Sequence, residues 1–523
     1  MGMADYVTLS VYLLGMLAMG LYFARRNTST EQYFVGGRKI PGIVIGLSLI
    51  GTSISSMTFL SMPGDAFKGS WINFLYNLGL IPAVVIAGAC FLPFYRQGHV
   101  TSAYEYLGSR FGQPIRVYGA IAFIVAQLIR VSIILYLISI PIGEITHLDP
   151  VKCIVLGGIL VSIYTIIGGI EAVVWTDVIQ TIVLLLGGIV CVVLVAMKLD
   201  NGLSDVWQVG LADHKLSIHE LMQDGSLRPV SWGWSLTHKT APLLLLFGLT
   251  HFMTEYTANQ NVIQRYCASK SLAEAKKAMY FCMVSSIVIW ALFMLVGTSL
   301  YVYYQEHPHP EATAMLQGQK PESGILPLFI LSHMPPGLAG FVMAAAIAAA
   351  MSSLDSSINA ISAVVVVDLL RPNRKRHVSD TADLRIAQVV AVASSVVMIG
   401  GAVILSGMQS NTLQTTANAL ASLCGAGLLG MYLIGFLTRK GDTRSIGAGI
   451  ACTLVFSLWM VLNDKAPQVL PSVLQIKIDS YYATLIGNAI MFMVGFSLAC
   501  LIPRKQPLAA HQTIWDVDYD QVT

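Results

Sequence analysis

Thirteen stretches of this chain are apolar and long enough, or nearly long enough, to cross a lipid bilayer as a helix. A membrane-spanning helix needs about 20 predominantly apolar residues, and it satisfies its backbone polar groups within the segment. Only 11% of the residues are charged and the mean hydropathy is +0.68, whereas soluble proteins carry about 25% charged residues. We therefore predict an all-α membrane protein with about thirteen transmembrane helices. The stretches are 6–23, 41–62, 71–94, 118–145, 151–167, 173–197, 241–260, 279–304, 338–369, 386–407, 417–437, 446–462 and 483–502.

The basic residues indicate how the chain is oriented. If the N-terminus lies outside and the spans alternate, most of the 31 lysine and arginine residues fall on the cytoplasmic side, as the positive-inside rule requires. Among them are Arg265, after the seventh stretch, and the cluster that begins at Arg371. We expect an integral protein of the plasma membrane, the inner membrane of a bacterium, with a short cytoplasmic tail at 506–523. The net charge of +3 is too small to indicate a nucleic-acid partner.

Two of the stretches carry residues that weaken a helix. In 41–62, Gly51 is followed by a run of threonine and serine residues, and in 241–260, Gly248 is followed by threonines, a histidine, a glutamate and an asparagine. Irregular backbone at membrane depth is tolerated where it lines a cavity. We therefore predict that these two spans are interrupted.

The interrupted spans are five apart and enter the membrane from opposite sides, as two inverted five-helix repeats require. This organisation predicts one transmembrane domain, 1–505, without detectable residue-level similarity between its halves. The first stretch lacks the features of a cleaved signal peptide, so we expect it to be retained as an additional helix. The predicted parts are the extra N-terminal helix 6–23, repeat one 41–197, repeat two 241–437 and two C-terminal helices within 446–502.

The ninth stretch contains a carboxylate among hydroxyls. Ser352, Asp355 and Ser356 are at positions i, i+3 and i+4 and share one face of a helix. Ionisable residues inside the membrane are usually functional, and oxygen ligands suit a hard cation. This face could bind sodium or a proton, or it could pack against a neighbouring helix through polar contacts.

Two further charged residues lie within apolar stretches. Asp177, early in the sixth, could cap a helix at the interface or bind an ion. Arg130 lies near the middle of the fourth, where a cation costs roughly 2.5–3.5 kcal/mol on insertion scales. Its planar guanidinium could bind a substrate carboxylate through two hydrogen bonds. Alternatively, it could form an internal bridge to Glu144, Glu255 or Asp355.

The sequence contains no phosphate-binding loop, zinc-ligand pattern or nucleophile motif. We therefore expect a carrier and not an enzyme, with no organic cofactor and no obligate protein partner. The expected partners are a small-molecule substrate and the lipid bilayer.

Four local patterns occur in an order that is familiar. They are EQYFVGGR at 31–38, GGIEAVVWTD at 168–177, QRY at 264–266 and SSLDS at 352–356. With these patterns the chain resembles the sodium:solute symporter family. The resemblance implies the leucine-transporter fold with an extra N-terminal helix, and co-transported sodium ions. It also implies a sodium site formed by the backbone carbonyls of Gly51, Ile54 and Ala349 and the hydroxyls of Ser352 and Ser353.

Within the family, the segment VTSAYEYL at 100–107 and the residues around Arg130 are similar to those of bacterial sialic acid transporters. This likeness implies that Arg130 binds the substrate carboxylate. It also implies a substrate pocket lined by Ser53, Ser55, Thr58 and Asn77, and a second sodium site formed by Asp177, Ser352, Asp355 and Ser356.

Three of these positions depart from that branch. Ser53 replaces a threonine and Asn77 replaces a glutamine, and both changes bear on the identity of the substrate. Asp355 replaces a serine and adds a negative charge to the second sodium site, where it could strengthen sodium binding or pair with another residue instead. The leading hypothesis is sodium-coupled uptake of an acidic sugar such as sialic acid. A neutral sugar, a polyol or a monocarboxylate is the alternative substrate, and a transporter-like solute sensor is the alternative class.

Overall fold

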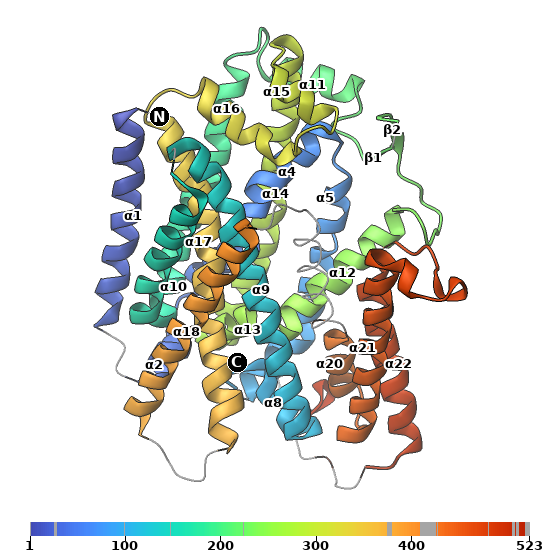
Figure 1. Ribbon diagram of the computed structural model, residues 1–523. Coiled ribbons are helices and arrows are strands. Elements are labelled where there is room, and N and C mark those ends of the chain that lie inside the picture. The colour runs from blue at the N-terminus through green and yellow to red at the C-terminus, as the bar shows by residue number, and fades with distance from the viewer. Residues whose placement is uncertain are drawn as a thin grey trace.

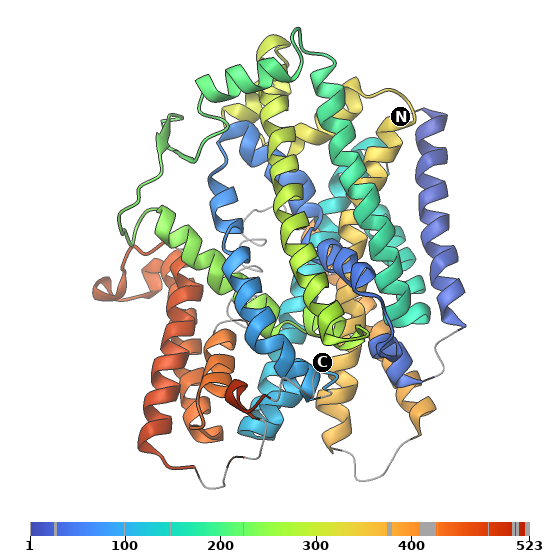
Figure 2. The same ribbon diagram turned by 180° about the vertical axis from the view of Figure 1, so that it is seen from behind.

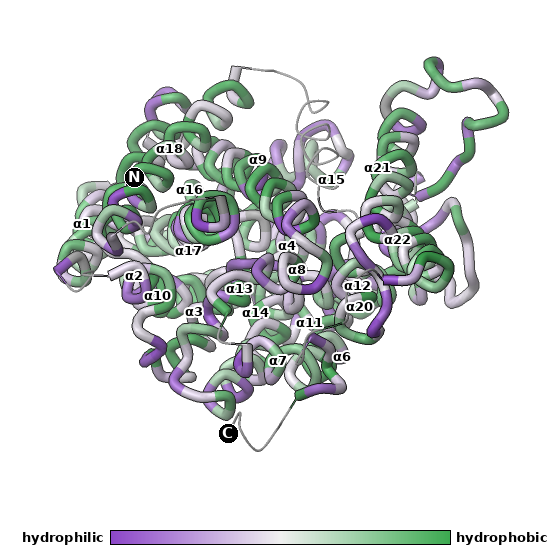
Figure 3. Tube along the Cα trace, turned by 90° about the horizontal axis from the view of Figure 1, so that it is seen from below, coloured by the Kyte–Doolittle hydropathy of each residue, from purple (hydrophilic) through white to green (hydrophobic). Residues whose placement is uncertain are grey.

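The computed structural model describes residues 2–25, 29–98, 100–146, 148–222, 224–373, 379–407, 425, 427–479, 481–504, 508 and 512–517. The chain forms an upright bundle of helices (Figure 1), in which the N-terminal helix α1 and the C-terminal helices α21 and α22 lie on opposite flanks. The view from behind shows the same arrangement (Figure 2). From below, hydrophobic residues dominate α9, α18 and α21 on the outside of the bundle, and hydrophilic residues lie both near the centre and in turns at the rim (Figure 3). This distribution is expected of a bundle that has lipid as its outer solvent.

The α-helices follow in chain order, and two short strands form an antiparallel pair. They are α1 (Met3–Ala24), α2 (Thr30–Val35), α3 (Gly42–Ser53), α4 (Ser56–Lys68), α5 (Ile72–Asn77), α6 (Leu80–Ile86), α7 (Leu92–Gln97), α8 (Ala103–Phe111), α9 (Gln113–Thr146), α10 (Pro150–Ala196), α11 (Leu203–Ala212), β1 (His219–Leu221), β2 (Leu227–Pro229), α12 (Ala241–Ala258), α13 (Gln260–Ala268), α14 (Leu272–Glu306), α15 (Pro310–Leu316), α16 (Ile325–His333), α17 (Leu338–Val364), α18 (Asp380–Gly407), α20 (Leu428–Leu437), α21 (Thr443–Lys465) and α22 (Tyr481–Leu501).

Within the described residues, nine helices are long and apolar enough to span a membrane, or ten if the bent pair α3 and α4 is one span. The predicted fifth and sixth spans lie in the single 47-residue helix α10, which is kinked at Gly169. Gly169 has φ 57° and ψ −160°, and a Cβ there would lie 2.8 Å from the ring of Tyr33. Only glycine suits this kink. In the predicted eleventh span, 417–424 lies outside the described residues, so the count of thirteen stays a prediction.

Of the two spans that we predicted to be interrupted, 41–62 is broken near its middle, whereas 241–260 is helical through Gly248 and breaks only at Asn259, near its end. Helix α3 ends at Ser53 and α4 begins at Ser56, with Ile54 and Ser55 extended between them and a bend of 57°. In the other span, α12 ends one residue before Asn259, whose φ of −84° and ψ of 118° are not helical. The chain then continues as α13, which the sequence analysis had not predicted as a helix.

Helix α17 occupies the middle of the bundle and is the most enclosed of the long apolar helices described. Its alanine-rich first half allows close approach by its neighbours, because small side chains let helix backbones come together. It packs against α1, α3, α4, α9, α10 and α18. The predicted ion-binding face of α17 is therefore buried among helices that carry the other candidate residues.

Part of the C-terminal tail is docked on the bundle. The amide of Gln512 donates a hydrogen bond to the Ser109 carbonyl over 2.9 Å, and Asp516 pairs with Arg439 at 2.7 Å. These contacts join the tail to α8 and to the end of α20.

Candidate substrate and sodium sites

The break between α3 and α4 faces the ion-binding face of α17. The Ser352 hydroxyl donates to the Gly51 carbonyl over 2.8 Å and lies 3.3 Å from the Ala349 carbonyl. The Ser353 hydroxyl is buried and has no hydrogen-bond partner within the described chain. Ile54 lies in the break itself, where a carbonyl is released from the helical ladder. The arrangement offers only oxygen ligands, which suit a hard cation such as sodium.

Asp177 lies in the interior of the bundle, in the second half of α10. It is completely buried and receives hydrogen bonds from the Ser48 hydroxyl and, over 2.8 Å, from the guanidinium of Arg265. An interfacial capping role is therefore wrong. One of its oxygens is used by these donors, and the other is buried without a partner in the described chain.

Arg265 is the main residue that the sequence analysis misplaced. We predicted that it belongs to a cytoplasmic loop, but it lies in α13 with an exposure of 0%. Besides Asp177, its guanidinium donates to the Ser48 hydroxyl, the Asn261 carbonyl and the Ser356 hydroxyl, each over 2.7 Å. A buried guanidinium with this many acceptors is satisfied in place and joins α3, α10, α13 and α17.

Asp355 is held beside this network. Its two oxygens accept hydrogen bonds from the Tyr164 hydroxyl over 2.7 Å and from the Ser356 amide over 2.6 Å. Asp177 and Asp355 are both fully buried, and in the described residues Arg265 is the single basic group bonded to either. If both carboxyls are ionised, the cluster carries one uncompensated negative charge. A monovalent cation would balance it.

Arg130 contrasts with Arg265 because it has no partner within the described chain. It lies halfway along the 34-residue helix α9, so about 25 Å of helix separates it from either end. Its guanidinium makes no hydrogen bond or ion pair with any residue that the structure describes. Gln127, one turn earlier on the same face, is bonded to Ser357 of α17 at 3.1 Å. Arg130 therefore lies on the side of α9 that meets the central helix.

The internal bridges that could have explained Arg130 are not formed in the described part of the chain. Asp355 is bonded to Tyr164 and Ser356, and Glu255 accepts a hydrogen bond from Asn259 over 2.7 Å. The side chain of Glu144, the third predicted partner, lies outside the described residues. The bridges to Asp355 and Glu255 are therefore wrong.

The predicted pocket residues lie at two places. Ser53, Ser55 and Thr58 flank the break between α3 and α4, and the hydroxyls of Ser55 and Thr58 form no hydrogen bond with the described chain. Asn77 ends α5 with 2% exposure, and its amide nitrogen has no partner among the described residues. Helix α9, which carries Arg130, packs against α4. Polar groups without partners in the described chain therefore lie beside the break and at the end of α5.

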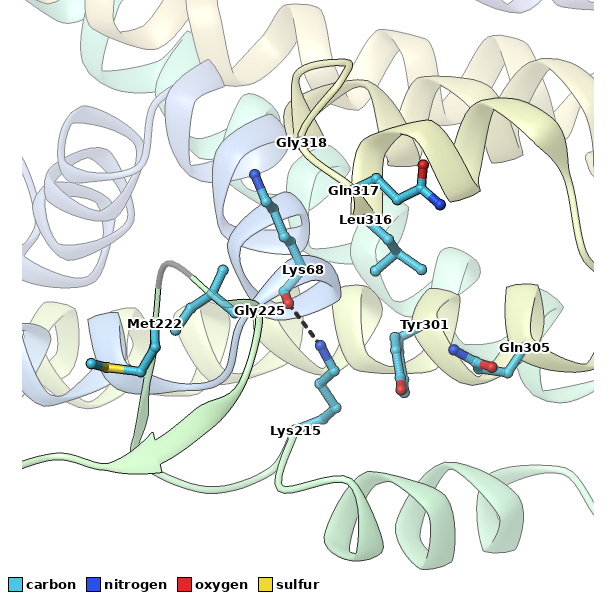
Figure 4. Close-up of a pocket in the computed structure, with 10 residues that line it drawn as sticks. Lys68, Lys215, Met222, Gly225, Tyr301, Gln305, Leu316, Gln317 and Gly318 are labelled. Atoms are coloured by element: carbon cyan, nitrogen blue, oxygen red, sulfur yellow. Dashed lines mark hydrogen bonds between the residues drawn. The ribbon is translucent and has the colours of Figure 1, made fainter.

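A cavity of about 480 Å³ lies elsewhere, at the end of the bundle that bears α11, α15 and the two strands (Figure 4). Its two lysines already have partners. Lys215 donates to the Phe67 and Lys68 carbonyls at the end of α4, over 3.0 and 2.8 Å, and Lys68 pairs with Glu322 at 3.3 Å. None of the predicted site residues lines this cavity, and its lysines stabilise the end of α4.

These features define a membrane-embedded carrier with a leucine-transporter-type fold. A substrate-bound, outward-open Na⁺-coupled sialic acid symporter superposes with a TM-score of 0.85, at 29% identity, over 97% of this chain and 100% of that one. The chain is 32% identical to the sodium/sialic acid symporter SiaT of Proteus mirabilis, over 87% of this chain and 88% of the relative. It is 31% identical to the sodium/sialic acid symporter NanT of Aliivibrio fischeri, over 88% of each.

Residues 33–444 match the model of the sodium:solute symporter family, and the chain belongs to this family. It is therefore an integral membrane protein that couples the movement of a small solute to sodium. The fold and the coupling ion that the sequence motifs predicted are confirmed.

Proposed function

We propose that this chain imports an acidic sugar such as sialic acid, driven by sodium. The observation that carries the proposal is Arg130, a guanidinium at mid-membrane without a counter-ion among the described residues. An unpaired charge within a membrane-spanning helix is costly, and a bound carboxylate offsets that cost through two parallel hydrogen bonds. The sodium/sialic acid symporters to which the chain is similar support this class of substrate.

In this proposal, Ser53, Ser55, Thr58 and Asn77 line the substrate pocket with Arg130. The hydroxyls of Ser55 and Thr58 and the amide nitrogen of Asn77 have no hydrogen-bond partner among the described residues, and such groups are suited to the many hydroxyls of a sugar. The Asn77 amide nitrogen supports the assignment. It is a buried donor without an acceptor among the described residues, and buried donors in folded proteins nearly always have a hydrogen-bond partner.

Two sodium ions accompany the substrate. The first is bound by the carbonyls of Gly51, Ile54 and Ala349 with the hydroxyls of Ser352 and Ser353, and the contact between Ser352 and Gly51 supports this set. The second is bound at the cluster that contains Asp177, Ser352, Asp355 and Ser356, where one negative charge is uncompensated. We place the protein in a bacterial inner membrane with its N-terminus outside and its C-terminus in the cytoplasm.

The experiment is uptake into proteoliposomes of purified protein under an inward sodium gradient, with an equal potassium gradient as the control. Radiolabelled sialic acid, glucose, inositol and pyruvate are compared in one panel. We expect accumulation of sialic acid with sodium and none with potassium. Sodium-driven uptake of glucose or inositol, without uptake of sialic acid, would contradict the proposal.

A further inference from the structure

The segment 466–478, which joins α21 to α22, has an unusual composition for an exposed connection. Seven of its 13 residues are apolar, Lys477 is its one charged residue, and it has no acidic residue. The connection 199–240, which contacts the start of α22, has five acidic residues. Connections that face water are normally polar. In 466–478, however, Val469 and Val473 are 67% and 85% exposed, so the segment needs an apolar environment.

The segment continues a surface that already faces lipid. In both views it projects sideways from the flank of the bundle, beside the start of α22 (Figures 1 and 2). Helices α21 and α22 are long and apolar enough to span a membrane, and Val455, Leu458 and Met493 are exposed on them. Exposed apolar side chains on a spanning helix have lipid as their solvent. The apolar side chains of 466–478 therefore extend this lipid-facing surface at the end of the two helices.

The backbone of the segment is held by hydrogen bonds from side chains. Asn463 of α21 accepts from the Ile476 amide over 3.2 Å and donates to the Ile476 carbonyl over 2.6 Å. The indole of Trp459 donates to the Leu474 carbonyl over 3.0 Å, and the Gln475 amide donates to two carbonyls of the segment, each over 2.9 Å. In contact with lipid, backbone polar groups must be satisfied by the protein. The segment thus exposes apolar side chains while its polar backbone groups are bonded internally.

A second group of exposed apolar side chains lies beside this segment, in the chain that leads into α12. It consists of Trp232, Trp234 and Leu236, which are 69%, 70% and 56% exposed. The Leu236 carbonyl accepts a hydrogen bond from the Asp479 amide over 2.8 Å, so the two stretches are joined. Tryptophan is enriched where a protein passes through the interface between membrane and water. The position of these tryptophans agrees with an interface at this level.

We propose that the segment 466–478 inserts into the membrane interface on the side where α12 and α22 begin, and that Trp232 and Trp234 insert beside it. The partner is the lipid surface itself. Acyl chains cover Val469 and Val473, and the single charge, Lys477, has the sign that phosphate headgroups attract. The segment anchors the ends of α21 and α22 and, through the bond to Leu236, the chain that enters α12. It contains none of the predicted substrate or sodium residues.

The test is tryptophan fluorescence of the full chain in phosphatidylcholine vesicles, with and without brominated phosphatidylcholine, which quenches tryptophan on contact. Val473→Trp adds a tryptophan at the most exposed apolar position of the segment. The difference between the spectra of this variant and wild type isolates the added residue. Its emission should be blue-shifted and largely lost in brominated lipid, and iodide in the water should leave most of it intact, because the site is covered by lipid.

The matched control is Asp224→Trp, in the turn between β1 and β2, where the side chain is 59% exposed. Its added emission should be quenched by iodide and not by brominated lipid. Equal quenching of the two variants by iodide would overturn the inference. Blue-shifted emission from Val473→Trp that brominated lipid does not quench would indicate contact with a second copy of the chain, and would overturn it as well. Val469→Trp gives the same readout if Val473→Trp does not fold.

Discussion

Arg265 and Arg130 both lie on helices of the bundle, and their surroundings are opposite. Arg265 is fully enclosed and donates to Asp177, to two serine hydroxyls and to a backbone carbonyl. Arg130 lies at the middle of α9 and has no partner in the described part of the chain. Both carry the same planar group with five donors.

The difference separates a charge that holds helices together from a charge that can bind a ligand. A buried guanidinium whose acceptors all come from the protein joins helices and has no capacity left for a ligand. A guanidinium without acceptors among the described residues, such as that of Arg130, has donors left for a ligand that enters and leaves. On this account, substitution of Arg265 should damage the fold, and substitution of Arg130 should damage binding alone.

The largest effect is expected for Arg265→Gln. Loss of one partner of a buried ion pair leaves the other charge uncompensated, which costs about 3–5 kcal/mol. The variant should therefore show a much lower unfolding temperature, or a low yield of monodisperse protein, in thermal unfolding followed by size-exclusion chromatography. Lys277→Gln, at a lysine that is 77% exposed, is the control and should behave as wild type. A stable Arg265→Gln would remove the distinction between the two arginines.

A second effect concerns the charge that Arg265 leaves uncompensated. If Asp355 helps to bind a second sodium ion, wild type moves one net positive charge with each monoanionic substrate. A membrane potential then contributes roughly 2.3 kcal/mol per 100 mV. Asp355→Asn should lose the second sodium and make uptake electroneutral.

The measurement is uptake into proteoliposomes whose potential is set by a potassium gradient and valinomycin. Wild type and the exposed control Asp200→Asn should be stimulated when the interior is negative, whereas Asp355→Asn should not respond. Stimulation of Asp355→Asn to the wild-type extent would exclude Asp355 from the coupling site.

A smaller effect is expected for Ser352→Ala. The Ser352 hydroxyl contacts the Gly51 carbonyl over 2.8 Å, and loss of one such oxygen should cost about 1 kcal/mol. The sodium concentration that gives half-maximal uptake should therefore rise about fivefold. Ser395→Ala removes an equally buried hydroxyl that bonds within its own helix, and it serves as the control. An unchanged sodium curve for Ser352→Ala would remove this serine from the first sodium site.

Much of the architecture could be predicted because it depends on local signals. Long apolar runs fix the helices, and the glycine and hydroxyl residues after Gly51 indicated a break that lies between Ser53 and Ser56. Arg130 was identifiable because it interrupts an otherwise apolar run. The boundaries of the two repeats stay predictions, and so do the residues that bind sodium and the substrate.

Arg265 was misplaced for a physical reason. Helix α13 has only nine residues and is rich in polar ones, so it does not resemble a span, and the positive-inside rule assigns such a basic residue to a loop. Its true position depends on Ser48, Asp177 and Ser356, which are distant in sequence. The signal that could have found it is Asn259, whose side chain accepts a hydrogen bond from the Asn261 amide at the start of α13.

The measurement that tests the central claim most directly is binding calorimetry of sialic acid and of its neutral carboxamide. It is carried out on folded wild type, Arg130→Lys and Arg130→Gln. Wild type should prefer the acid at least about tenfold, because hydrogen bonds between charged groups contribute roughly 1.5–3 kcal/mol. Arg130→Lys should bind the acid weakly, since it keeps the charge and loses the planar fork, and Arg130→Gln should bind it more weakly still. Both variants should unfold near the wild-type temperature. Equal binding of acid and amide by wild type, or normal binding of sialic acid by Arg130→Gln, would contradict the account.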